Sequence, residues 1–567
     1  MMRTAAWALL ALLVLPESIM AQPVPVQGPN GRYHAVVQGV TSRPLPVAAA
    51  SPSRPLTATV SQQSLDAPPP PPPIETPPAP VGPQPDLVVA TSAGALGGEK
   101  LGDGSFAFRA VPFAMPPIGD LRWTAPRDVK PWQGVRYYKE SAPACLQASY
   151  GWQKDLAAAS SEDCLYLEIR TPAPNGKLPV MVFIHGGANR AGGGAGTISA
   201  GFASKGVVIV SLQYRLGVFG FLSHPALSGE QGGASGNYAL MDQIKALEWV
   251  RDNIAAFGGD SGNVTIFGHS AGAQDVGLLL ASPLARGLFQ KAISESGPPQ
   301  FGLPPRSLAE NEAMGVELAK VYSLNTAPDS DAALADLRRA PAMALQEAGD
   351  KLAVPVEDES FIWLQAVVDG KVLPRAPEDV FRAGAAAHVP LIIGVSAQEL
   401  GLHGGSTAIY SAIFKAFGEN RFKAMRFYRI DTGNKVKADP VLGDVAMQMS
   451  TDIMVRCPAD WTAAKMTKAG NRAWLYHLAV NHGDGPVHHG SELQFVMNPR
   501  PVGETDATWP PLLDMWTNFA KTGDPNGPGL PTWPVYGADK AYIDFTTRGP
   551  YVRTALRGPI CELRDTP

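Results

Sequence analysis

The sequence predicts an α/β fold in which a central, mostly parallel sheet carries helices on both faces. Continuous apolar runs at 180–184 and 207–212 are typical of strands that are buried on both sides. Helix-forming stretches alternate with such runs along the chain, and this order favours parallel strands joined by helical crossovers. A third observation is local: residues 268–272 (GHSAG) stand between an apolar run and a helix-forming stretch, where a strand would turn sharply into a helix.

The elements are expected in the following order. After the strands at 180–184 and 207–212, a helix spans 238–257 with its apolar residues on one stripe, and a Gly-Gly-Asp sequence ends it. A strand at 264–267 leads through residues 268–272 into a helix at 271–281. Further strands are expected at 291–294, 391–395 and 473–478. The stretch 300–390 is mostly helical in composition, and we expect it to form walls above the sheet.

The N-terminus is typical of an export signal. Arg3 supplies a positive charge, an apolar core runs over 5–16, and Ala21 offers a small residue at a cleavage point. We therefore expect a signal peptide over 1–21 and a periplasmic or secreted protein, with an uncleaved anchor as the alternative. Residues 22–86 are rich in proline and predict an extended linker without a core, or else a ligand for a partner that recognises proline-rich segments. The folded domain is expected over 87–567.

Composition and charge narrow the class of protein. A chain of 567 residues with 45% hydrophobic residues has material for a large core. The formal net charge of −4 gives no electrostatic reason to expect a nucleic acid or an anionic membrane surface as partner. Once the signal is cleaved, no stable membrane span is expected, and the oligomeric state cannot be read from the sequence.

Four cysteines in an exported chain suggest two disulfides, and three pairings are possible. Pairing Cys145 with Cys164 would close a short loop, and Cys457 with Cys561 would then tie the C-terminal tail to the body.

Ser270, at the centre of residues 268–272, has the context of a nucleophile. The glycines on either side permit the sharp turn, and the following helix points free N–H groups at the serine. A serine hydroxyl needs a base to take its proton and an acid to orient that base. In this architecture the acid follows the serine in the chain and the histidine follows the acid.

Candidates for both partners follow Ser270. Glu399 lies in a loop directly after the strand at 391–395 and is the best-placed acid, whereas Asp369, in a Val-Asp-Gly sequence, is better explained as a turn residue. Six histidines follow Ser270, and the pair His488 and His489 comes just after a predicted strand. The residues alone do not choose between these two.

Donors for a developing oxyanion are also predicted. The sequence His-Gly-Gly-Ala at 185–188 follows the strand at 180–184, so the N–H groups of Gly186 and Gly187 can approach a ligand closely. The N–H of Ala271, one residue past the serine, is the third expected donor.

With these residues in place, the chain resembles the type B carboxylesterases, a family that includes cholinesterase-like enzymes and secreted lipases. The resemblance runs from about Leu87 to Cys561. The segments that carry it are 111–123 (VPFAMPPIGDLRW), 161–167 (SEDCLYL), 213–222 (QYRLGVFGFL), 257–260 (FGGD), the serine motif, and 523–526 (GDPN).

The resemblance implies the α/β-hydrolase fold and a serine hydrolase that cleaves carboxylic esters through an acyl-enzyme. It implies Ser270 as nucleophile, Glu399 as acid and His489 as base, since 489–493 (HGSEL) matches the family pattern. It also implies Gly186, Gly187 and Ala271 as oxyanion donors and the disulfide Cys145–Cys164. A small-molecule ester is the expected partner, and neither a cofactor nor a metal is required. The alternatives are amide or thioester hydrolysis on the same scaffold, or a non-catalytic binding protein, although family members of that kind typically lose the serine.

The chain departs from the family pattern at several positions. His269 stands where glutamate is common, Gln213 where asparagine is usual, and Leu400 where glycine is frequent. Residues 190–196 (RAGGGAG) are unusually rich in glycine beside the expected oxyanion loop. We expect this loop either to move or to leave one side of the pocket open.

Overall fold

A computed structural model describes residues 84–301, 304–323, 325–352, 362–402, 405–433, 436–483 and 485–564. The predicted signal peptide over 1–21 and the predicted linker up to residue 83 lie outside these residues. Asp86, the last residue of the expected linker, is bonded to residues of the sheet: its N–H donates to Gly98 O at 2.9 Å and its carboxylate accepts from Lys100 N at 2.8 Å.

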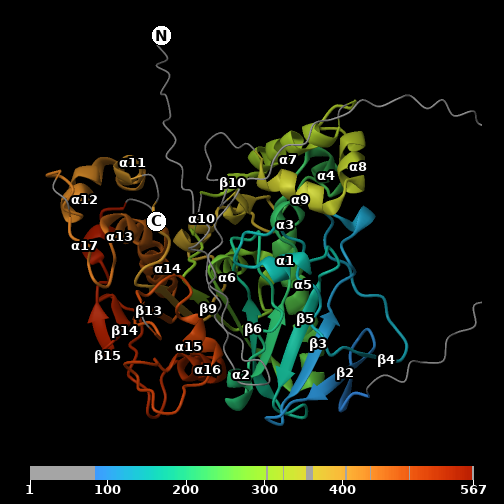
Figure 1. The fold of residues 1–567 in the computed structure, drawn as a ribbon, viewed down its shortest axis with the longest axis horizontal. Helices are drawn as coiled ribbons and strands as arrows, with labels where there is room; N and C mark the ends of the chain where they lie inside the picture. The colour runs from blue at the N-terminus through green and yellow to red at the C-terminus, as the bar shows by residue number, and fades with distance from the viewer. Residues whose placement is uncertain are drawn as a thin grey trace, which may run out of the picture. The chain divides into compact units, whose positions relative to one another are not determined.

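A single twisted sheet organises the described residues (Figure 1). Its strands lie in the order β1-β2-β3-β5-β7-β6-β8-β9-β12-β13-β14-β15, with β4 paired to β2. The strands from β7 to β14 are parallel, which is the predicted arrangement. Their bounds are β6 Leu178–Ile184, β7 Val208–Leu212, β8 Gly259–His269, β9 Lys291–Glu295, β12 Leu391–Ser396, β13 Ala473–Ala479 and β14 Ala541–Thr546.

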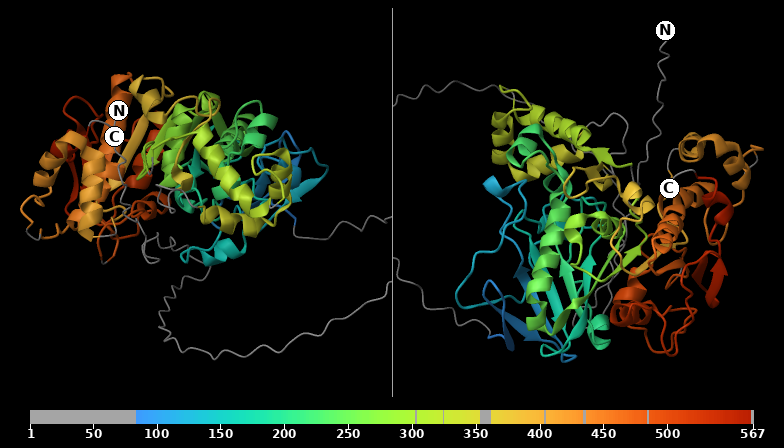
Figure 2. Two further views of the ribbon diagram at one scale, coloured as in Figure 1. Left: turned by 90° about the horizontal axis from the view of Figure 1, so that it is seen from above. Right: turned by 180° about the vertical axis from the view of Figure 1, so that it is seen from behind.

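Antiparallel strands extend both ends of this sheet, and the sequence reasoning did not foresee them. At the N-terminal end they are β1 Leu87–Ala90, β2 Ala95–Lys100, β3 Phe106–Pro112 and β5 Tyr166–Thr171, and the short β4 spans Val135–Tyr137. At the C-terminal end β15 Gly549–Thr554 pairs with β14. The chain therefore crosses the sheet from its N-terminal strands at one edge to its C-terminal strands at the other, as the colours of Figures 1 and 2 show.

Helices cover both faces of the sheet because the side chains of the central strands alternate between two cores. In β6, Val180 and Val182 pack in one core with α5 (Tyr238–Asn253) and α6 (Ala271–Ala281). Met181 and Phe183 point the other way, into a core with α2 (Ala200–Ser204) and α16 (Leu512–Thr522). Both sides of β6 are thus fully buried, which accounts for its uninterrupted apolar sequence.

The predicted elements match the observed ones closely around the site. The helix at 271–281 is α6, residue for residue, and the strand at 291–294 is β9 with one further residue. The helix expected over 238–257 ends as an α-helix at Asn253 and continues as a 3₁₀ turn over Ile254–Phe257. The strand expected at 264–267 is longer, since β8 already begins at Gly259 and pairs there with Leu178.

Helical segments gather beyond the C-terminal ends of the parallel strands. Figure 1 shows α7, α8 and α9 beside α3 and α4, and contacts between these helices agree. Their bounds are α3 Gly217–Phe221, α4 Pro225–Glu230, α7 Leu308–Tyr322, α8 Asp331–Arg339 and α9 Ala342–Asp350. Because α3 follows β7 directly, this helical layer stands above the edge of the sheet where the predicted site residues lie. The stretch 300–390 therefore contains the helices that its composition indicated, together with a small sheet of β10 (Arg306–Ser307) and β11 (Val367–Val368).

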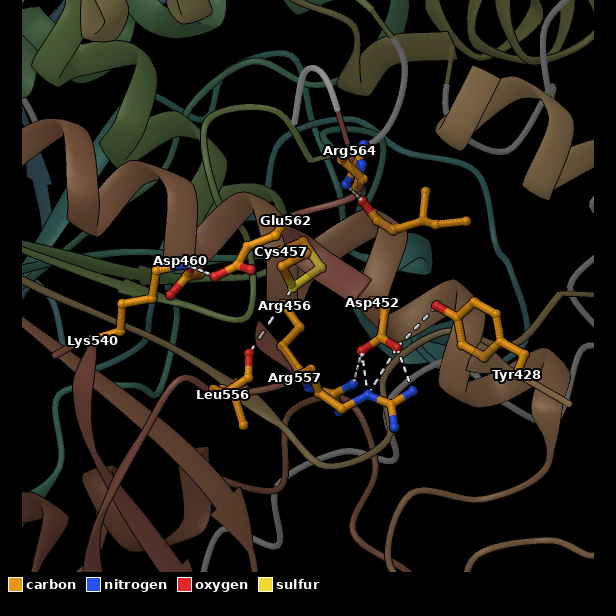
Figure 3. Close-up of a disulfide and its surroundings, with 12 residues drawn as sticks. Tyr428, Asp452, Arg456, Cys457, Asp460, Lys540, Leu556, Arg557, Glu562 and Arg564 are labelled. Carbon is orange, nitrogen blue, oxygen red and sulfur yellow. Dashed lines mark hydrogen bonds and ion pairs between the residues drawn. A yellow bond between two sulfur atoms is a disulfide. The ribbon is translucent and has the colours of Figure 1, made fainter. Parts of the chain in front are cut away.

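All four cysteines are paired, as Cys145–Cys164 and Cys457–Cys561. The second bond joins the start of α14 (Cys457–Lys468) to the end of α17 (Gly558–Cys561), beside a buried ion cluster (Figure 3). There the fully buried Asp452 pairs with Arg456 and Arg557. Arg456 also donates to Ala397 O at 2.9 Å, and so ties the cluster to the loop that leads to Glu399.

Candidate active site

Ser270 lies at the point where β8 ends and α6 begins. It has φ 58° and ψ −124°, a conformation that non-glycine residues rarely adopt and that is typical of a strained strand-to-helix turn. Its own N–H donates to Glu295 O at 2.9 Å, which anchors the turn to the neighbouring β9. The strain is therefore held by the sheet, as expected where backbone geometry serves a site.

The two glycines of the turn are required by close backbone contacts. A Cβ at Gly268 would lie 2.6 Å from the backbone of Gly272 and 2.7 Å from Ile184 O. A Cβ at Gly272 would lie 2.1 Å from Ile184 O. A side chain at either position would clash with backbone atoms, and its absence lets the start of α6 lie directly against the end of β6.

The structure brings Ser270, His489 and Glu399 together. His489 Nε2 lies 2.8 Å from Ser270 Oγ, so the hydroxyl can donate to the imidazole. His489 Nδ1 lies 2.5 Å from Glu399 Oε2, so the other side of the ring donates to the carboxylate. His489 is 219 residues from Ser270 and 90 residues from Glu399 in the sequence, yet the three side chains form one continuous chain of hydrogen bonds.

The loop around Glu399 is held from several sides. The second carboxylate oxygen, Oε1, accepts from Ser396 N at 2.7 Å, and the N–H of Glu399 donates to Thr451 Oγ1 at 3.1 Å. The Glu399 side chain has no solvent exposure. Leu400, where the family has glycine, is buried and leaves this arrangement intact.

The other candidates lie elsewhere. His488 is exposed, and its ring nitrogen Nδ1 contacts the carbonyl of His489 at 3.1 Å. Asp369 accepts from the N–H groups of Lys371 at 3.0 Å and Leu373 at 2.9 Å, so it is the turn residue that its sequence indicated.

The surroundings of His489 favour its protonated form. Burial alone would lower the pKa of His489, but the charge of Glu399, the hydrogen bond to that carboxylate and the charge of Glu492 outweigh it and raise the pKa. An imidazole in this setting accepts a proton from the serine more readily than a free histidine would.

Two of the three predicted donor groups border Ser270: Ala271 follows it in the chain, and Gly186 packs against it. A Cβ at Gly186 would lie 3.0 Å from Ser270 Cβ and 2.6 Å from His269 O, so this backbone packs directly on the serine turn. Gly187 follows with φ 117°. Within the described ranges, the N–H groups of Gly186, Gly187 and Ala271 donate to no other residue, and each is available to a ligand.

The glycine-rich segment 190–196 is held by hydrogen bonds to its surroundings. Gly192 donates to Gln147 Oε1 at 2.8 Å and its carbonyl accepts from Gln147 Nε2 at 2.7 Å. A Cβ at Gly194 would lie 2.6 Å from Ser211 Oγ, so the glycines allow a close approach to β7. Gln213, the other departure nearby, donates to Pro143 O at 2.8 Å.

Two buried carboxylates behind the site were missed by the sequence reasoning. Glu492, quoted only as part of the histidine motif, is fully buried and accepts from Ser296 Oγ at 2.5 Å and Ser396 Oγ at 2.9 Å. Glu295 accepts from Trp516 Nε1 at 2.6 Å. Burial raises the pKa of both groups, and Glu492 further raises that of Glu295. For Glu492 the sequence did contain a signal, because this carboxylate follows His489 by only three residues in the same motif.

His269 gives the site a second imidazole. Its ring centroid lies 4.6 Å from that of His489, and its Nε2 is buried without a hydrogen-bond partner among the described residues. Burial and the nearby His489 and His488 hold the pKa of His269 well below 6.5, so the ring is neutral. The family's glutamate is thus replaced by an uncharged group.

Within the described ranges, no cluster of three or more His, Cys, Asp or Glu side chains could hold a metal ion, and no helix is long and apolar enough to cross a bilayer.

Known proteins resemble this chain in sequence and in fold. The model of the carboxylesterase family matches residues 85–563. Carboxylesterase 1D of Mus musculus is 34% identical over 490 residues, which cover 77% of this chain and 84% of that protein. Fumonisin B1 esterase of Sphingopyxis macrogoltabida is 34% identical over 482 residues, covering 80% and 85%.

Solved structures agree with the sequence relatives. A PNB esterase has a TM-score of 0.70 at 31% identity, covering 84% of this chain and 99% of its own. The carboxylesterase EST55 of Geobacillus stearothermophilus has a TM-score of 0.69 at 30% identity, covering 84% and 100%. With an α/β-hydrolase sheet, a serine at its strand-to-helix turn and relatives of these kinds, the chain belongs to the carboxylesterase family and is a carboxylic ester hydrolase.

Proposed function

We propose that this protein hydrolyses small-molecule carboxylic esters through an acyl-enzyme, with Ser270 as nucleophile, His489 as base and Glu399 as the acid that orients it. The observation that carries the proposal is the chain of hydrogen bonds from Ser270 Oγ through both ring nitrogens of His489 to Glu399. A surface serine, or a histidine that is merely buried, would not be connected in this way.

Acylation begins when Ser270 Oγ attacks the ester carbonyl carbon and His489 Nε2 takes the serine proton. The carbonyl oxygen becomes an oxyanion and accepts hydrogen bonds from the N–H groups of Gly186, Gly187 and Ala271. As the tetrahedral intermediate collapses, the bond to the alcohol oxygen breaks and His489 gives its proton to that oxygen. The alcohol leaves, and the acyl group stays esterified to Ser270.

Deacylation repeats these steps with water. His489 takes a proton from a water molecule as its oxygen attacks the acyl carbon, and the same donors bind the new oxyanion. The bond to Ser270 Oγ then breaks, the serine recovers its proton from His489, and the carboxylic acid is released. Throughout, the charge of Glu399 stabilises the imidazolium that forms twice in each cycle.

Substitutions of the serine and of the paired histidines test these roles. We expect Ser270→Ala and His489→Ala each to lower kcat for p-nitrophenyl butyrate by about 10⁴- to 10⁶-fold. His488→Ala is the matched control, because the adjacent imidazole is exposed, and its kcat should stay within about threefold of wild type. Equal losses in the two histidine variants, or full turnover by Ser270→Ala, would contradict the proposal.

The preferred type of bond is tested with three substrates that share a butyryl group and differ in the leaving group. We expect butyrate esters to be hydrolysed faster than the matched anilide, because the amide carbonyl is less electrophilic and its nitrogen leaves only once His489 has protonated it. A butyryl thioester measures the third class. A higher kcat/KM on the anilide or the thioester than on the ester would reassign the natural bond.

We further propose that residues 1–21 direct export, that 22–86 form a linker and that 87–567 form the catalytic domain, in a periplasmic or secreted protein. Two disulfides in the folded chain support an oxidising compartment. Fractionation of expressing cells into cytoplasm, periplasm and medium, with esterase activity as readout, tests this assignment. Activity confined to the cytoplasm would contradict it.

A further inference from the structure

The loop that carries Gly186 and Gly187 has a backbone that needs support. Gly187, Ala188 and Asn189 follow one another with φ of 117°, 56° and 55°. Ala188 has a Cβ, and a left-handed conformation is unfavourable for such a residue by about 1–2 kcal/mol, whereas asparagine tolerates it better. Contacts from the rest of the molecule must therefore hold this loop in place.

Asn189 provides most of those contacts. It is almost fully buried, its carbonyl accepts from Gly217 N at 2.6 Å, and its side-chain oxygen lies 3.2 Å from the hydroxyl of Tyr214. The single hydroxyl hydrogen of Tyr214 points to the nearer acceptor, His185 O at 2.7 Å, so one tyrosine contacts the loop on both sides of its glycines. The side-chain nitrogen of Asn189 donates to Asp275 Oδ1 at 3.1 Å.

Asp275 is a buried carboxylate on α6, the helix that begins directly after Ser270. It has no solvent exposure, and its other oxygen accepts from Gln243 Nε2 at 2.6 Å. None of the described lysines or arginines forms an ion pair with it. Burial raises the pKa of Asp275 to about 7 against the opposing effect of Gln243 and Asn189. A core position selected for stability alone would favour an apolar side chain, since an unpaired buried carboxylate is destabilising.

We propose that Asp275 is a positioning residue of the ester-hydrolysing site, which holds the Gly186 and Gly187 N–H groups in register with Ser270 through its hydrogen bond to Asn189. The helix α6 carries both the serine turn and this carboxylate, so a bond from Asp275 to the loop fixes the loop relative to the nucleophile. The inference rests on the proposed roles of Ser270 and the two glycines.

Two substitutions remove the bond from opposite ends. Asp275→Ala deletes the acceptor, and Asn189→Gly deletes the donor while keeping a residue for which φ 55° is unstrained. Each variant is assayed with p-nitrophenyl butyrate after titration of active sites with an organophosphate. Binding of a trifluoromethyl ketone, whose adduct carries an oxyanion, is measured in parallel.

Because oxyanion contacts act in the transition state, we expect kcat to fall by about 10- to 100-fold in both variants while KM stays within about threefold. The Ki of the ketone should rise by the same factor as kcat falls. Gln243→Ala is the matched control, since Gln243 bonds the same carboxylate and contributes no hydrogen bond to the loop. It should lower Tm yet leave kcat within about threefold of wild type.

A purely structural role for Asp275 would lower Tm and leave kcat per active site and ketone affinity unchanged in both variants, which would overturn the proposal. An equal loss of kcat in Gln243→Ala would overturn it as well. If Asp275→Ala does not fold, the kcat and ketone affinity of Asn189→Gly test the proposal by themselves. Failure of the proposed function would instead appear as full turnover by Ser270→Ala, a result that is independent of Asp275.

Discussion

Replacing Gly272 with alanine tests the close contact between the start of α6 and the end of β6. The new Cβ would lie 2.1 Å from Ile184 O and 2.6 Å from His185 O. Carbon–oxygen contacts in proteins are rarely shorter than about 3.3 Å, so the two backbones must separate by about 1.2 Å. Both contacts are with backbone atoms, and no side-chain rotation can relieve them.

This displacement occurs at the centre of the site. His185 directly precedes Gly186, and Gly272 follows Ser270 by two residues, so the separation moves the loop donors away from the nucleophile. A misplacement of about 1 Å at a reacting centre lowers rates by about 10²-fold. Overpacking of this kind also destabilises a fold by about 1–3 kcal/mol. We therefore expect Gly272→Ala to reduce kcat about 100-fold and to lower Tm.

The assay is kcat on p-nitrophenyl butyrate per titrated active site, at a temperature well below the Tm of each variant. Gly229→Ala is the matched control, because Gly229 lies in α4 with open space around the added Cβ. It should leave kcat unchanged and raise stability by up to about 1 kcal/mol. Wild-type kcat in a correctly folded Gly272→Ala variant would show that this contact does not position the loop donors.

Three further predictions follow from the same structure. Glu399 raises the pKa of His489 above 6.5 and the base acts only when neutral, so the acid limb of kcat/KM should lie above pH 6.5 in wild type. Glu399→Gln should move this limb to lower pH and lower kcat/KM about 10⁴-fold. An acid limb at the same pH in the variant would contradict the role of Glu399. Cys457→Ser/Cys561→Ser should lower the free energy of unfolding by up to about 4.7 kcal/mol, since the bond closes a loop of 104 residues, and denaturant titration of the double variant measures the loss. Deleting residues 22–83 should leave kcat and KM unchanged, and a truncated protein that is inactive although folded would show that this segment contributes to the site.

Much of the site could be predicted because its signals are local. The strand, the turn at Ser270 and the helix at 271–281 are encoded by adjacent residues; the helix agrees with α6 at both ends, and the strand lies within the longer β8. The choice between His488 and His489 was different. The residues alone left it open, because exposure of one imidazole and burial of the other depend on how the loop packs against His269 and Glu399. Only the resemblance favoured His489.

Features that depend on long-range packing were not predicted. The antiparallel pairs β3–β5 and β5–β7 join segments that are far apart in the sequence, so no local signal predicts them. Asn189 and Asp275 are 86 residues apart, and neither looks unusual in its own segment. The burial of Glu295 and Glu492 behind His489 likewise arises only when the end of β9 meets the loop that carries His489.

The identity of the nucleophile is tested by mapping where an organophosphate reacts. Intact protein is inhibited with diethyl p-nitrophenyl phosphate, and the modified peptide is identified by mass spectrometry. We predict one diethylphosphoryl group per chain, on Ser270, with loss of activity in proportion to modification. Complete inhibition with the adduct on any other residue would contradict the central claim that Ser270 is the nucleophile.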